Sequence, residues 1–157
     1  MAEAAVVNSS PLIALAAIGH FDILRLAARS VVVTEAVKTE VTDDRSRQAM
    51  ASCTWLRQVP NPPIPPRIAG FDLGAGEKTV LAWAVAHPGA DVVLDDRAAR
   101  RFALDLGLRV RGTLGLVLLA KRHAVIPAAR PVVEQLRATG LYLSDKLMSQ
   151  ALALVGE

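Results

Sequence analysis

Three short apolar runs constrain the fold of this chain more than any other feature of its sequence. They lie at Ala4–Val7, Val31–Val33 and Val92–Leu94, and none alternates between apolar and polar residues. A strand that is apolar at every position is typical of a parallel sheet with helices on both faces. Helix-forming sequence follows each run, so the pattern predicts an α/β fold. Weaker strand signals lie at Trp55–Val59 and Arg109–Arg111.

Helix signals fill the segments between these runs. Pro11 suits a first helical turn and opens a helix across Leu12–Ile18, and Thr34 predicts a capped helix that reaches about Asp43. Together these elements predict a three-layer α/β sandwich with a central, mostly parallel sheet and a helical C-terminal tail. The other predicted helices span Glu77–Ala86, Asp96–Leu106, Leu114–Arg122 after a Thr113 cap, Pro127–Ala138, and Asp145–Val155 after a Ser144 cap.

The length of 157 residues favours one domain with a sizeable core. We expect the core over residues 4–127 and a helical extension over residues 127–157. The segment Pro60–Pro66 holds five prolines and therefore forms neither a central strand nor a helix. It is either a stiff loop or a polyproline II ligand for a partner domain.

Composition narrows the chemistry that the chain can support. Hydrophobic residues make up 52% and charged residues 21%, which is typical of a globular protein. Cys53 is the only cysteine and the three histidines are far apart, so a metal site would use oxygen ligands, which favours Mg²⁺ or Mn²⁺. The net charge of +3 is compatible with a polyanionic partner such as RNA.

Nothing in the sequence indicates a membrane or an export signal. The N-terminus carries Glu3 and no basic stretch, and no apolar run approaches the roughly 20 residues that span a bilayer. We expect a cytoplasmic protein with no membrane association.

Polar and acidic side chains are predicted to gather at one edge of the sheet. Asn8 follows the first strand and the pair Asp95–Asp96 follows Val92–Leu94. The carboxyl ends of parallel strands meet at one edge, where ligands bind in open α/β sheets. At 100° per residue, Glu40 lies on the apolar face of its helix, and Glu77 faces inward from the first turn of another. Such a cluster could hold one or two divalent cations.

Each acid also has a structural explanation. A helix N-terminus favours an acid such as Glu77, and Asp95–Asp96 could form an N-cap with a salt bridge to Arg97 or Arg100. The run GAGEKT at Gly74–Thr79 resembles a phosphate-binding loop with one intruding glutamate. A nucleotide site is the weaker interpretation, because a proline-rich segment precedes this run where that motif requires a buried strand.

The chain as a whole resembles PIN-domain proteins, the compact α/β nuclease fold of toxin–antitoxin ribonucleases and RNA-processing factors. The order of the NSSPLI, GxGE, LDDRxAR and GTLG blocks points to a poorly characterised prokaryotic branch of that family. The resemblance rests on VVNSSPLIAL at Val6–Leu15, VTEAVKTEV at Val33–Val41, GAGEKTVLAWA at Gly74–Ala84, DVVLDDRAAR at Asp91–Arg100, GTLGLVLLAKRHAVIP at Gly112–Pro127 and LSDKLMSQAL near the C-terminus.

The resemblance implies a four-acid site for Mg²⁺ or Mn²⁺. Its first ligand falls on Asn8, and the catalytic acids fall on Glu40, Glu77 and Asp96, with Asp95 as an alternative or additional ligand. Ser10 matches a small hydroxyl residue that follows the first ligand by two positions in the family. Beside the acids, Ser10, Arg97, Arg100 and Arg101 are candidates for binding the substrate, although each arginine could equally be part of a solvated helix face.

The implied activity is that of a metal-dependent endoribonuclease acting as the toxin of a type II toxin–antitoxin pair. Its implied partners are RNA, a cognate antitoxin and a second copy of the chain. Most PIN nucleases have aspartate where this chain has Asn8. An amide oxygen ligates a hard cation without contributing charge, so the alternative is a weak or inactive PIN module that binds RNA or a protein.

Overall fold

Five parallel strands form the centre of the molecule in the computed structural model, which describes residues 1–157. Their order is β3-β2-β1-β4-β5, and every neighbouring pair is parallel. The expected parallel sheet is therefore confirmed, including both of its weaker strands. The strands are β1 (Ala2–Val7), β2 (Ala28–Thr34), β3 (Leu56–Val59), β4 (Asp91–Val93) and β5 (Arg109–Arg111).

Nine α-helices and one 3₁₀ helix connect and cover the strands. No helix combines the length and the hydropathy that a membrane span requires. The helices are α1 (Ser9–Ala17), the 3₁₀ helix η1 (Phe21–Leu26), α2 (Glu35–Glu40), α3 (Asp44–Ser52), α4 (Pro66–Ala69), α5 (Ala75–Ala86), α6 (Arg97–Asp105), α7 (Thr113–Arg122), α8 (Arg130–Ala138) and α9 (Asp145–Ala153).

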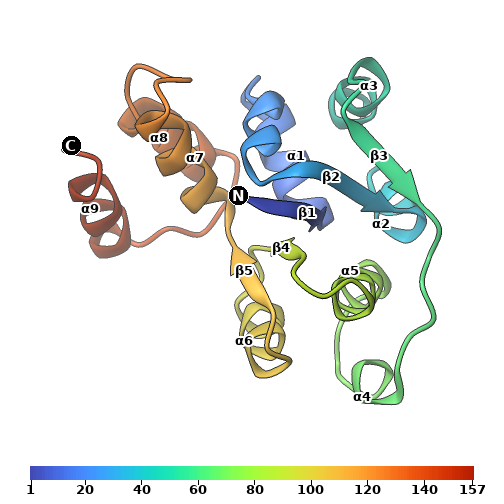
Figure 1. Cartoon of the computed structure of the whole chain (residues 1–157). Coiled ribbons are helices and arrows are strands. Elements are labelled where there is room, and N and C mark those ends of the chain that lie inside the picture. Colours follow the sequence, from blue (N-terminus) through green and yellow to red (C-terminus); the bar gives the residue numbers. More distant parts are fainter.

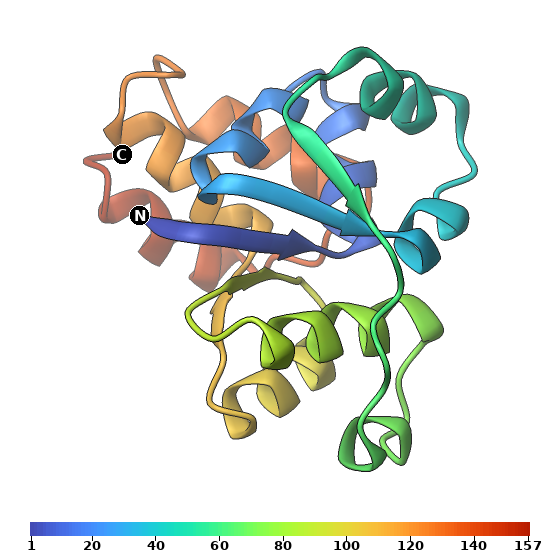
Figure 2. The same cartoon turned by 45° about the vertical axis from the view of Figure 1, so that its right-hand side comes forward.

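The helices lie on both faces of the sheet, which makes the three-layer sandwich (Figures 1 and 2). On one face, α5 packs against β1, β2 and β4, α6 packs against β5, and α4 lies beside α5. On the other face lie α1, η1, α3 and α7, and the helices α8 and α9 pack against α7. The predicted fold class is thus confirmed.

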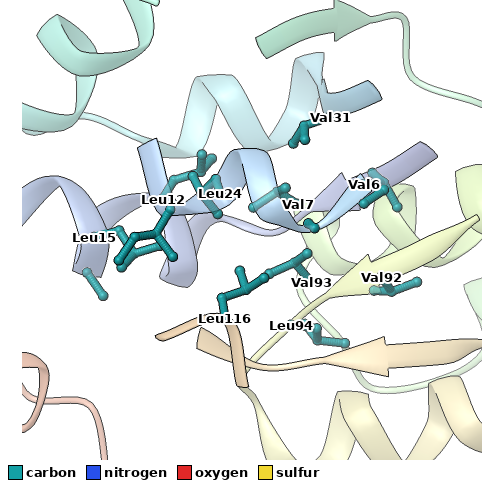
Figure 3. Packing of buried hydrophobic residues seen from close by; sticks show 14 of the residues in the cluster. Val6, Val7, Leu12, Leu15, Leu24, Val31, Val92, Val93, Leu94 and Leu116 are labelled. Carbon is teal, nitrogen blue, oxygen red and sulfur yellow. The ribbon is translucent and has the colours of Figure 1, made fainter. Parts of the chain in front are cut away.

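Burial on both faces explains why the strands are uniformly apolar. Val6 and Val7 of β1 are both fully buried although they point to opposite faces. Val7 lies on the side of Leu12 and Leu116, whereas Val6 points away from them (Figure 3). Each such side chain contributes about 1.5–3 kcal/mol to the stability of the fold. These residues belong to one hydrophobic cluster of 41 buried residues.

The helix predicted from Thr34 to about Asp43 is divided in two in the structure. Thr34 does cap α2, accepting a hydrogen bond from the Val37 N–H at 3.3 Å. The helix then ends at Glu40, and Asp43 caps α3 by accepting from the Ser46 N–H at 2.9 Å. The prediction of one helix was wrong because an aspartate at this position bonds the backbone and starts a new helix.

Three other sequence expectations changed. Gly112 is the N-cap of α7 in place of Thr113, and α8 begins at Arg130 and not at Pro127. The short helices η1 and α4 were not predicted. The segment from Pro60 to Pro65 forms no regular structure, as expected of a stiff loop, and the Asn61 side chain within it accepts a hydrogen bond from the Ala36 N–H at 2.8 Å.

Candidate active site

The chain reverses its direction of travel across the sheet between β1 and β4. From β1 the chain runs through β2 to β3 at one edge, while β4 leads to β5 at the other. Ligands of open α/β sheets bind outside the carboxyl ends of the strands at such a switch point. The Asn8 N–H donates to the Val93 carbonyl at 3.0 Å, which holds the ends of β1 and β4 side by side. Asp95 and Asp96 follow β4 at the same edge.

Asn8 is buried at this edge with an unused oxygen. Its exposed fraction is 4%, and its Oδ1 atom has no hydrogen-bond partner. Asn8 is also the N-cap of α1, yet its side chain makes no capping bond. A buried polar atom without a partner costs about 1–3 kcal/mol. Asn8 Oδ1 is therefore available to a cation or a hydrogen-bond donor that enters the site.

Glu77 has one oxygen at a helix N-terminus and one without any partner. It is the third residue of α5, and its Oε1 atom faces the N-cap residue Gly74. This arrangement resembles one half of a capping box, in which an acid at the third helical position accepts from the backbone N–H of the N-cap residue. The Oε2 atom is buried and unpaired. The inward orientation predicted for Glu77 is confirmed.

The electrostatic surroundings of Glu77 disfavour its charged form. Burial raises the pKa of Glu77, the negative charge of Asp96 raises it further, and Glu40 adds a smaller increase, against the opposing effect of the Gly74 backbone. These contributions place three of the four predicted acids within electrostatic reach of one another. A cation among them would stabilise the charged form of Glu77.

Glu40 is brought to the start of α5 by a glycine. Its Oε1 atom accepts a hydrogen bond from the Gly76 N–H at 2.8 Å. A Cβ atom on residue 76 would lie only 2.7 Å from the Glu40 carboxyl carbon, so a larger side chain would displace the carboxylate. The helix N-terminus in turn favours the negative charge. Glu40 is exposed to solvent at the end of α2, rather than buried as its position on the apolar stripe predicted.

The structure distinguishes the neighbouring acids Asp95 and Asp96. Both oxygens of Asp95 are occupied at the start of α7, because Oδ1 accepts from the Thr113 N–H at 2.8 Å and Oδ2 from the Thr113 hydroxyl at 2.6 Å. Asp96 caps α6 through Oδ2, which accepts from the Ala99 N–H at 2.9 Å. Its side chain is exposed, and its second oxygen makes no hydrogen bond within the chain.

The four predicted substrate-binding residues differ in burial and in hydrogen bonding. Arg100 is half-buried and donates to the Leu94 carbonyl at 3.0 Å, so its guanidinium supports the end of β4. Arg97 and Arg101 are exposed on α6 and form no ion pair. Ser10 is exposed and lines a cavity of about 410 Å³ that Asp95 and Asp96 also line.

The predicted cluster of four metal ligands is not assembled in this structure. No group of three or more His, Cys, Asp or Glu side chains is placed to hold a metal ion. Glu40 and Asp95 are instead hydrogen-bonded to donors of the chain. The unpaired Asn8 Oδ1 and Glu77 Oε2 atoms are nevertheless hard oxygen donors, the kind that Mg²⁺ and Mn²⁺ prefer. The residues therefore fit a divalent cation in their chemistry.

Three residues that shape this site had no predicted role in it. Gly76 admits the Glu40 carboxylate, Thr113 holds Asp95, and Gly112 leaves room for the Arg100 guanidinium and the Asp95 carboxylate. The glycine of the GTLG block was a usable signal, because glycine often marks a close approach of another group to the backbone. The partner of Thr113 could not be found from the sequence, since Asp95 lies 18 residues away.

Together, the parallel α/β sandwich and the acids at its switch point define an α/β domain with an oxygen-donor site. The chain belongs to the PIN-domain family, because the family model described as DUF3368, PIN domain, matches residues 4–157. This family has a nuclease fold, and PIN domains generally use divalent metal ions.

The chain was also compared with solved structures and with curated proteins. Among solved structures, the chain is similar to a PilT N-terminus domain protein from the hyperthermophilic archaeon Sulfolobus solfataricus P2. The TM-score is 0.47 and the sequence identity 16%, over 72% of this chain and 89% of the other. No curated protein matches the chain.

Proposed function

We propose that this protein is a Mg²⁺- or Mn²⁺-dependent endoribonuclease. The observation that carries the proposal is Glu77, a half-buried carboxylate with a raised pKa and an unpaired oxygen, at the edge of the sheet where Asn8 also leaves an oxygen unpaired. An unpaired, partly desolvated carboxylate reduces the stability of the fold, and groups of this kind cluster at functional sites. Family membership supports phosphodiester hydrolysis as that function.

The residues would divide the work as follows. Glu77, Asp96 and Asn8 would hold the cation, since each has an oxygen that the chain leaves free. Glu40 would remain on the Gly76 amide and add negative charge near the cation. A divalent cation supplies a Lewis acid for the attack of water on the RNA phosphodiester.

The positive residues would act on the RNA. Arg97 and Arg101 are exposed and unpaired on α6, directly after the acids, and would bind RNA phosphates. Arg100 would act indirectly, because its bond to Leu94 holds the end of β4 that carries both aspartates.

The decisive test is an RNA cleavage assay with purified protein in Mg²⁺ or Mn²⁺ and in EDTA. We expect cleavage with either metal, none in EDTA, and a loss of about 100-fold or more in Glu77→Gln and Asp96→Asn. Glu134→Gln and Asp105→Asn make the same chemical changes at exposed positions on α8 and α6 and serve as controls. Full activity in both site variants would rule out the proposal.

A weak or inactive PIN module that binds RNA or a protein is the second candidate. Asn8 favours it, because a neutral amide in place of a carboxylate lowers the charge available to hold a cation. Under this alternative, the parent protein binds RNA or its protein partner without cleavage. Asn8→Asp would then strengthen Mn²⁺ binding in calorimetry and create or raise cleavage. Unchanged Mn²⁺ affinity in Asn8→Asp would show that the amide is not what limits metal binding.

We further propose that the ribonuclease is the toxin of a type II toxin–antitoxin pair, is cytoplasmic and forms a homodimer. Support comes from the resemblance to toxin ribonucleases. Controlled expression of the parent and of Glu77→Gln in a bacterial host tests the first point, and sedimentation of the purified protein tests the last. Growth arrest by the parent alone is expected, and arrest by both would contradict a toxic ribonuclease activity.

A further inference from the structure

The connection between α8 and α9 carries a tyrosine beside the candidate active site. Tyr142 is the only tyrosine of the chain and, at 88%, has the largest exposed fraction among its large apolar side chains. It lines the cavity of about 410 Å³ that Asp95, Asp96 and Ser10 also line. In Figure 1 this connection passes below α7 on its way to α9.

The backbone of the connection that carries Tyr142 is held at both ends. Gly140 ends α8 with a φ of +106°, and the Ser144 hydroxyl caps α9 by accepting from the Leu147 N–H at 3.1 Å. Between these points Leu143 is buried in the core while Tyr142 points to solvent. The exposed ring itself is free to turn, so stacking on a ligand would order it.

The backbone of this connection is also free to bind. The N–H and C=O groups of residues 141–143 make no hydrogen bond within the chain. They therefore offer donors and acceptors next to the ring, the combination that reads the edge of an unpaired base while an aromatic side chain stacks on its face.

The charge and polarity of the cavity lining favour the base of a nucleotide over its phosphate. It contains no lysine or arginine, and its charged members are Asp95 and Asp96, so an anionic phosphate is disfavoured. Ile13, Ala14 and Ala17 of α1 give it an apolar wall. An uncharged base matches this lining, because its ring contacts the apolar wall and its amino group can donate to the unbonded backbone carbonyl groups of Leu141 and Tyr142.

We propose that this cavity is a base-binding subsite for single-stranded RNA, in which one unpaired base stacks on Tyr142 next to the scissile phosphodiester. The proposal rests on the proposed ribonuclease function for its ligand. Tyr142 is a specificity and positioning residue here, and the subsite favours unpaired substrates, because a paired base must first be unstacked and flipped out of its helix at a free-energy cost.

Two binding measurements test the subsite independently of cleavage. The first is the affinity of a short single-stranded RNA for Glu77→Gln in Mg²⁺, alone and combined with Tyr142→Ala, Tyr142→Phe or the exposed control Leu104→Ala. We expect Tyr142→Ala to weaken binding by about 5- to 150-fold, while Tyr142→Phe and Leu104→Ala change it by less than about threefold. The second uses 3-fluorotyrosine, which gives one fluorine resonance because the chain has one tyrosine. Single-stranded RNA should shift this resonance, and an abasic strand of the same length should not.

The outcomes separate this proposal from the ribonuclease proposal. RNA binding that depends on Tyr142, in a protein that cleaves nothing, supports the subsite and rejects the ribonuclease. Metal-dependent cleavage with equal affinity in Tyr142→Ala and its parent supports the ribonuclease and overturns the subsite. Absence of RNA binding, or equal resonance shifts with normal and abasic strands, also overturns the subsite.

Discussion

The Thr113 hydroxyl is the most informative single group to remove, because it determines what Asp95 does. Thr113 is fully buried and its hydroxyl donates to Asp95 Oδ2 at 2.6 Å. Valine has nearly the same shape and lacks the donor. A hydrogen bond to a charged acceptor contributes about 1.5–3 kcal/mol, and the added methyl group returns about 0.8 kcal/mol. Thr113→Val should therefore lower the free energy of unfolding by about 1–2 kcal/mol.

That loss corresponds to a fall of about 2–8 °C in Tm for a protein of this size. Urea unfolding and thermal melting followed by circular dichroism measure it, with Thr113→Ser as the control that keeps the hydroxyl. If Asp95 serves to attach α7, Thr113→Val retains most of its RNA cleavage well below its Tm. Asp96→Asn should keep a normal Tm and lose RNA cleavage, because asparagine still caps α6 but brings no charge to the site.

Two results would refute this reasoning. Equal stability of Thr113→Val and the parent would mean that the bond to Asp95 contributes no more than the ~0.8 kcal/mol that the added methyl group returns. If Thr113→Val has a normal Tm but cleaves RNA as slowly as Asp96→Asn, then Asp95 acts in the active site and Thr113 orients it there.

Three further predictions concern the same region. Burial and nearby charge raise the pKa of Glu77 in the folded state, so the folded protein binds more protons than the unfolded chain. The free energy of unfolding in EDTA should therefore fall as pH rises from about 4.5 through the raised pKa. Urea titrations at a series of pH values measure this slope, and Glu77→Gln should flatten it. Gly76→Ala should displace Glu40, which costs about 1.5–3 kcal/mol of hydrogen bonding, while the higher helix propensity of alanine returns about 1 kcal/mol. Gly115→Ala is the control, because a Cβ has room there, and it should raise the free energy of unfolding by up to about 1 kcal/mol in the same assay. Arg100→Met should lower Tm by about 2–8 °C, because it removes the hydrogen bond to the Leu94 carbonyl at the end of β4. It should leave the salt dependence of RNA binding nearly unchanged. A marked loss of that dependence would mean that Arg100 contacts the RNA.

The order of strands and helices was readable from local sequence. Uniformly apolar runs such as Val31–Val33 predict strands buried on both faces, and all five expected strands are present in one parallel sheet. Caps at Thr34 and Ser144 were identified correctly because a cap depends on residues three positions apart. The same local reasoning failed at Asp43, where two plausible caps within ten residues compete and only packing decides between one helix and two.

At the candidate site, local sequence was enough to show which residues lie at the edge of the sheet. Asn8, Asp95 and Asp96 follow strands, and the inward direction of Glu77 follows from helical spacing. What each carboxylate does was decided only by tertiary structure. Thr113 occupies both oxygens of Asp95, Gly76 holds Glu40, and Glu77 and Asn8 each keep an unpaired oxygen. Spacing along a chain fixes the direction of a side chain, but its hydrogen-bond partner comes from a distant segment that only the folded chain brings within 3 Å.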